Sequence, residues 1–128
     1  MVVEKASKTI VCTHTVTQGR QHDRKLLAAS KVRFLAATKA LLDSGYQGFQ
    51  KEHQNTAIPA KKTKLKPLSK EQKKTNRQLA SDRVLAENVI GSLKRFRILA
   101  ERYRNRRKRF GLRFTLIAAI YNMELDIP

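Results

Sequence analysis

The sequence predicts an α/β fold in which a mixed sheet is flanked by helices, and three observations lead to this prediction. Polar and apolar residues alternate over Thr9–Thr17, as in a half-buried β-strand. Ser69 and Gln72 have the spacing of a capping box, and helical periodicity follows them as far as Lys94. A second apolar stretch of helical type begins at Phe110. A chain of 128 residues is about one domain, and we expect residues 1–128 to form one.

The charge of the chain indicates a polyanionic partner. Lysine and arginine number 28 against 10 acids, a formal charge of +18, while 41% of the residues are hydrophobic. That hydrophobic share predicts a folded basic domain rather than a disordered tail. Nucleic acid is the commonest partner of such a domain, and the alternative is a positive face that is only solvated.

Membrane insertion and cysteine chemistry are not indicated. The sequence has no apolar run long enough to span a membrane and no signal-peptide pattern at its start, so we expect a cytoplasmic protein. Cys12 is the only cysteine, which excludes an internal disulfide and a CxxC metal site.

The amino-terminal half contains several short elements. Val2–Val3 and Thr9–Thr17 are expected to form a hairpin, and Asp23 is expected to cap a short helix. Thr38–Leu42 has the composition of a short buried strand, and Thr56–Pro59 is a strand fragment inside a basic, irregular connector over residues 50–68.

The carboxyl-terminal half is helical and basic. After the long helix we expect a break at Arg97–Leu99 and a last helix of roughly three turns from Phe110, packed on the sheet. The densest basic cluster lies between them and includes Arg104, Arg106 and Arg107. In the connector, Lys61 and Lys62 suit contacts to phosphates that do not read bases.

Two carboxylates are candidate site residues. On a helix, Arg83, Glu87 and Lys94 fall within roughly 40° of one another, opposite an apolar face. Asp43 follows a strand and precedes Gly45 and Gly48, a position where α/β sheets place active groups. The alternatives are a surface salt-bridge ladder for the helical trio and an Asx-turn for Asp43.

Carboxylates that a sheet brings together suit Mg²⁺, which pairs with phosphate oxygens. Asp43 and Glu87 are two such acids in a basic setting, whereas a two-metal site normally needs at least three. The sequence has no glycine-rich phosphate loop and no Ser/His/Asp or Cys/His nucleophile set.

At this point the sequence resembles a known family over almost its whole length, Val2 to Leu125. It looks like the carboxyl-terminal part of a bacterial insertion-sequence transposase of the DDE class, most similar to the insertion sequence 5-type branch. The stretches that carry the resemblance are Gln21-His22-Asp23, Asp43-Ser44-Gly45-Tyr46-Gln47-Gly48, Asn76-Arg77-Gln78-Leu79-Ala80-Ser81, Arg83 to Lys94, and Tyr103 to Phe114.

The resemblance implies a ribonuclease-H-like fold that cuts and joins DNA strands with Mg²⁺ or Mn²⁺ in a two-metal site. By position, Asp43 matches the second acid of the catalytic triad and Glu87 the third. Arg83, Glu87 and Lys94 match a Tyr-Arg-Glu-Lys signature whose cations contact DNA phosphates. Ala80 stands where that signature has tyrosine. The implied partners are transposon ends and target DNA, with the oligomeric state left open.

No residue here matches the first acid of the triad, which lies on the first strand of that fold. The expectation is therefore a fold truncated at the amino terminus and a metal site that is incomplete in this chain. The chain would be a remnant, or the second of two frames joined to an upstream transposase segment by frameshifting, and inactive alone. The alternative function is a small basic, non-enzymatic nucleic-acid-binding protein, with Asp43 a turn cap and Glu87 an ion-pair partner.

Overall fold

A computed structural model describes residues 1–14, 22–102, 104 and 107–126. The chain divides into two compact units, one of Met1–Gly19 with Val84–Pro128 and one of Arg20–Arg83. We call them the terminal unit and the central unit. The strands are β1 Val2–Val3, β2 Ile10–Cys12, β3 Ala40–Leu41 and β4 Thr56–Ala57, and the helices are α1 Asp23–Ser30, α2 Lys70–Leu93, α3 Arg97–Ala100 and α4 Phe110–Leu125. Three 3₁₀ helices complete the described elements: η1 Ser44–Tyr46, η2 Phe49–Lys51 and η3 Arg107–Arg109.

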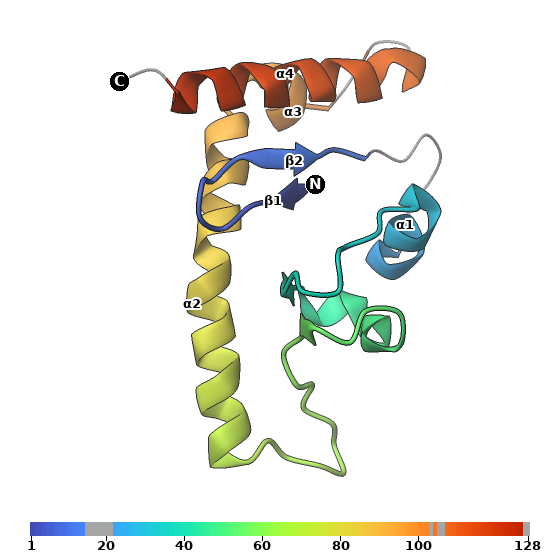
Figure 1. Cartoon of the computed structure of the whole chain (residues 1–128), viewed down its shortest axis with the longest axis vertical. Helices are drawn as coiled ribbons and strands as arrows, with labels where there is room; N and C mark the ends of the chain where they lie inside the picture. The colour runs from blue at the N-terminus through green and yellow to red at the C-terminus, as the bar shows by residue number, and fades with distance from the viewer. Residues whose placement is uncertain (15–21, 103, 105–106, 127–128) are drawn as a thin grey trace. The chain divides into compact units, whose positions relative to one another are not determined.

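The terminal unit contains the predicted hairpin packed against helices, but its second strand is shorter than the predicted Thr9–Thr17. β2 ends at Cys12, and residues 15–17 lie outside the described residues. β1 and β2 pair antiparallel, with Val2 opposite Cys12 and Val3 opposite Ile10. Ile10 is 5% exposed while Val11 is 67% exposed, so the two sides of β2 differ as expected. Figure 1 shows α4 lying across the carboxyl-terminal end of α2, with the hairpin beside that end. The buried core residues of this unit are Ile10, Val89, Leu93, Ile117, Ala118 and Tyr121.

A side-chain amide joins the last helix to the hairpin. The backbone N–H of Ile10 donates to Oδ1 of Asn122 at 2.9 Å, and Nδ2 of Asn122 donates to the carbonyl of Ile10 at 2.9 Å. Because both backbone groups lie beside the core, they need partners there. The Asn122 amide therefore pairs with both backbone groups of Ile10, as the backbone of a neighbouring strand would, and it fixes α4 to β2.

The carboxyl-terminal helices differ from the sequence prediction in their bounds. The break falls at Lys94–Phe96, and Arg97–Ala100 is a short helix, so the break predicted at Arg97–Leu99 is wrong by about one turn. α4 has 16 residues, more than the three turns predicted. It is apolar on both sides, since Leu112 and Leu116 are exposed opposite its buried face. Within the described ranges, no helix is both long and apolar enough to cross a membrane.

The central unit contains a parallel strand pair. Ala40 lies opposite Thr56 and Leu41 opposite Ala57, so both strand predictions are confirmed with shorter bounds. The capping box at the start of α2 is present: the Ser69 N–H donates to the Gln72 side chain at 3.0 Å, and the Gln72 N–H donates to the Ser69 hydroxyl at 3.1 Å.

The cap of α1 is a correction to the sequence prediction. His22 occupies the N-cap position, and its Nδ1 accepts a hydrogen bond from the Arg24 N–H at 3.3 Å. Asp23, the predicted cap, is the first residue of the helix instead. There its negative charge still favours the helix amino terminus.

Candidate active site

Asp43 lies where the parallel strand pair ends. β3 finishes at Leu41, and Asp43 is the N-cap of η1, its carboxylate accepting a hydrogen bond from the Ser44 N–H. Gly48, at the end of this segment, has a φ of 90°, a conformation that glycine adopts without steric cost. Asp43 therefore caps η1, although its side chain bonds to the next residue and not two residues on, as the Asx-turn considered from the sequence would require. The Asp43 side chain is 52% exposed, so its carboxylate also remains accessible.

The same carboxylate has a second partner that is far away in sequence. Nη1 of Arg83 donates to Oδ1 of Asp43 at 3.3 Å, across a sequence separation of 40 residues. The Arg83 side chain is 26% exposed, which makes the pair half-buried. This contact lies within the central unit and orients the carboxylate at the end of β3.

Asp23 provides a second carboxylate near η1, and the sequence indicated only a capping role for it. Oδ2 of Asp23 lies 3.1 Å from the place where a Cβ on Gly45 would be, so a side chain at Gly45 would press on that carboxylate. Burial raises the pKa of the Tyr46 hydroxyl above its ordinary value of 10.0, and the negative charges of Asp23 and Asp43 raise this pKa further. The one sequence signal was that Asp23 and Asp43 both belong to stretches that carry the family resemblance.

Glu87 lies on α2 one turn after Arg83 and is exposed. Lys94 follows the last residue of the helix, and its backbone N–H still donates to the carbonyl of Ile90 at 3.1 Å. Over the described residues, Arg83 pairs with Asp43 and Glu87 has no ion-pair partner. The surface salt-bridge ladder considered for Arg83, Glu87 and Lys94 is therefore absent.

The other basic candidates are spread over both units. Lys61 and Lys62 are exposed and directly follow Ala60 in the central unit. Arg104 is exposed in the terminal unit, and Arg107 begins η3. Arg106 lies outside the described residues.

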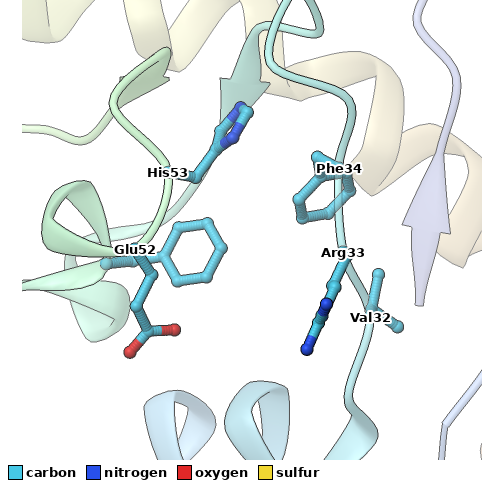
Figure 2. A pocket seen from close by; sticks show the side chains of 6 residues that line it. Val32, Arg33, Phe34, Glu52 and His53 are labelled. Atoms are coloured by element: carbon cyan, nitrogen blue, oxygen red, sulfur yellow. The ribbon is translucent and has the colours of Figure 1, made fainter.

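A cavity of about 260 Å³ lies in the central unit near η2. Figure 2 shows the side chains of Arg33 and Glu52 on opposite sides of it. Glu52 forms an ion pair with Arg24, and the Arg24 guanidinium also lies 5.5 Å from the centroid of the Phe49 ring. Because Arg24 neutralises the Glu52 carboxylate beside an aromatic ring, we assign this ion pair a structural role.

Carboxylate oxygens are the ligands that Mg²⁺ prefers, and one or two of them suffice when waters and substrate phosphates supply the rest. The accessible carboxylates of Asp43 and Glu87 fit this requirement by their chemistry. Nowhere in the described ranges do three or more His, Cys, Asp or Glu residues gather into a metal-binding group.

Comparison with known proteins gives the family. The profile of the family described as DDE superfamily endonuclease matches residues 1–122, so the chain belongs to that family. It is also 46% identical, over 127 residues, to a protein from Microchaete diplosiphon named as a probable transposase for insertion sequence element IS702. The match covers 99% of this chain and 46% of that relative, so the chain spans about half of the relative's length. No solved structure matches the chain significantly.

Proposed function

We propose that this chain forms part of the ribonuclease-H-like catalytic domain of a transposase, which cuts and joins DNA strands during DNA transposition. The observation that carries the proposal is the arrangement at Asp43: a carboxylate at the carboxyl end of a parallel strand, held by Arg83 of α2. Membership of the DDE endonuclease family supports the reaction class, and the relative's name supports transposition.

In this proposal Asp43 and Glu87 are the two acids of the site. Glu87 follows Arg83 by one turn of the same helix, about 6 Å along its axis. When bound to these carboxylates, Mg²⁺ or Mn²⁺ would activate the attacking oxygen and stabilise the leaving oxygen of a phosphodiester. Arg83 orients the Asp43 carboxylate through its hydrogen bond.

The basic residues would hold the DNA backbone. We assign phosphate contacts to Lys94 after α2, to Lys61 and Lys62 in the connector, and to Arg104, Arg106 and Arg107 before α4. We assign Arg83 the same role, a contact to the DNA phosphate that lies next to Asp43. Such contacts fix the register of DNA without reading its sequence.

The chain by itself should transfer strands poorly. The family's first acid matches no residue between Met1 and Pro128, so two of the three acids are available here. Losing one ligand of a metal site weakens metal binding. We therefore expect little or no strand transfer unless another polypeptide segment supplies the remaining acid.

Metal binding tests the proposal directly. Calorimetric titration of the purified chain with Mn²⁺ should show binding that weakens at least about tenfold in Asp43→Asn and in Glu87→Gln. Glu101→Gln is the matched control, because Glu101 is an exposed carboxylate outside the proposed site, and it should bind Mn²⁺ like the wild type.

Unchanged Mn²⁺ binding in both site variants would refute the assignment of the acids. If DNA binding persisted in those variants and showed no response to metal, the chain would be a non-enzymatic nucleic-acid-binding protein. Cleavage of DNA by the purified chain with Mg²⁺, abolished by Glu87→Gln, would instead refute the expectation of low activity.

A further inference from the structure

A long basic stretch lies in residues 60–77 of the central unit, all of which the structure describes. This stretch carries a single acid, Glu71, against eight cations, a net charge of +7. All eight cationic residues are exposed, and in the part of the chain that the structure describes none of them takes part in an ion pair. They are Lys61, Lys62, Lys64, Lys66, Lys70, Lys73, Lys74 and Arg77.

Hydrogen bonds tie the lysine-bearing loop back to the helix that follows it. The Ala60 N–H donates to Oδ1 of Asn76 at 2.9 Å, and Nδ2 of Asn76 donates to the Ala60 carbonyl at 3.0 Å. The Lys66 N–H donates to the Thr63 carbonyl at 3.3 Å and lies 3.1 Å from the Thr63 hydroxyl oxygen. The loop therefore starts beside the second turn of α2, bends at Thr63–Lys66 and returns to the capping box. Lys61 and Lys62, next to Ala60, are held close to the helix.

The helical cations share one face of α2. At about 100° per residue, Lys70, Lys73, Lys74 and Arg77 fall within roughly 100° of one another. The buried side chain of Leu79 lies on the opposite side, so burial of Leu79 turns the basic face towards solvent. Arg83 and Glu87 occupy a different sector, centred roughly 110° away.

The electrostatics of the helix itself disfavour this arrangement of cations. Cations in the first turns oppose the helix dipole, and like charges at spacings of three and four residues repel each other. A polyanion at the surface would offset both costs. The stretch contains no aromatic residue, so it offers no platform on which unpaired bases could stack. These properties favour the phosphates of a duplex over a single strand.

We propose that the eight cations of residues 60–77 form one phosphate-binding surface for double-stranded DNA, separate from the acids Asp43 and Glu87. This inference rests on the proposed function for the choice of DNA as the polyanion. Asn76 is a positioning residue in it, because its side chain fixes the loop against α2. The surface holds the duplex without reading sequence.

The salt dependence of DNA binding tests the surface. Anisotropy of a labelled random-sequence duplex is measured with the full chain in EDTA, so that metal plays no part. If all eight cations contact phosphates, they should contribute about −7 to the slope of log K against log salt, and the phosphate contacts proposed for other basic residues would add to this. The variant Lys61→Gln/Lys62→Gln/Lys70→Gln/Lys74→Gln should lower this slope by about 3.6, at roughly 0.9 for each phosphate that the variant no longer neutralises.

A charge-matched control separates the surface from net charge. Lys8→Gln/Lys25→Gln/Lys39→Gln/Lys51→Gln removes the same four charges from exposed positions elsewhere, and its slope should stay near the wild-type value. If the two quadruple variants changed the salt slope equally, residues 60–77 would not form a distinct DNA-binding surface, although DNA would remain the partner. A wild-type chain that binds no duplex, or a weakening seen with single-stranded RNA but not with duplex, would also overturn the surface. Failure of Mn²⁺ binding alone would affect only the proposed function.

Asn76 gives a second, independent readout. Asn76→Ala should reduce the salt slope by up to about 2, because Lys61 and Lys62 lose their fixed position. Adding Lys61→Gln and Lys62→Gln to Asn76→Ala should then change the slope less than the two substitutions do in the wild type. Full additivity, with unchanged helix content by circular dichroism, would overturn the positioning role.

Discussion

The hydrogen bonds between Asn122 and Ile10 allow a quantitative test of the terminal unit. Asn122→Ala removes two bonds of 2.9 Å and leaves the N–H and C=O of Ile10 without a side-chain partner. Removing each bond costs about 1 kcal/mol, and an unsatisfied buried group costs about 1–3 kcal/mol. Ile10 is 5% exposed, so water can replace the amide only in part.

Alanine has a higher helix propensity than asparagine, which offsets about 0.6 kcal/mol of this loss. The expected net decrease in the free energy of unfolding is therefore about 2–3 kcal/mol. Urea denaturation followed by circular dichroism should show a midpoint lower by about 1–2 M at an unchanged m-value.

Asn88→Ala is the matched control, because Asn88 is exposed on α2 and its side chain has no partner in the described part of the chain. Because the same gain in helix propensity applies, it should change the free energy of unfolding by no more than about 0.6 kcal/mol, in the stabilising direction. The reasoning is refuted if Asn122→Ala stays within that range, or if both variants lose stability equally.

Three further predictions concern the central unit and α2. The pKa of the Tyr46 hydroxyl is raised above 10.0 in the folded state, so keeping this hydroxyl protonated favours folding. This contribution to the free energy of unfolding is complete below pH 10 and is lost as the pH rises through the folded-state pKa. Tyr46→Phe should therefore lose less stability than the wild type in alkaline urea titrations, and an equal loss would contradict this. Gly48→Ala should destabilise by about 1 kcal/mol because its φ is 90°, whereas Gly91→Ala, in open space within α2, should stabilise by about 1 kcal/mol. If thermal melts showed that both variants shift the melting temperature in the same direction, the difference attributed to backbone conformation would be wrong. Ser69→Ala should cost about 1 kcal/mol by breaking the capping box, and Thr75→Ala, exposed within α2, serves as its control. A Ser69→Ala variant that melts at the wild-type temperature would show that the cap contributes nothing.

The sequence predicted the positions of most elements, because their signals are local. The alternation around Ile10 and the capping box at Ser69 each depend on neighbours within a few residues, and both are present. Element bounds were less accurate. The break after α2 and the cap of α1 were each misplaced, because short-range propensity does not decide which of several adjacent residues ends or begins a helix.

The candidate site was predictable in its residues but not in the partners of those residues. Asp43 and Glu87 were found through position and resemblance, and they remain proposals. The hydrogen bond of Arg83 with Asp43 was not foreseen, since the periodicity of α2 suggested a partner on the same helix. Asp23 was assigned to capping because no other ligand type stands nearby in sequence, whereas folding places it beside Gly45.

By itself the sequence determined the charge of +18, the α/β composition, the amphipathic or capped stretches and the resemblance to a family that the profile match confirms. Only the tertiary structure decided which polar side chains meet: Arg83 with Asp43, Asn76 with Ala60, and Asn122 with Ile10. The physical reason is that periodicity and capping act through neighbours along the chain. A side-chain amide or carboxylate instead takes whatever partner the packing brings within hydrogen-bond distance.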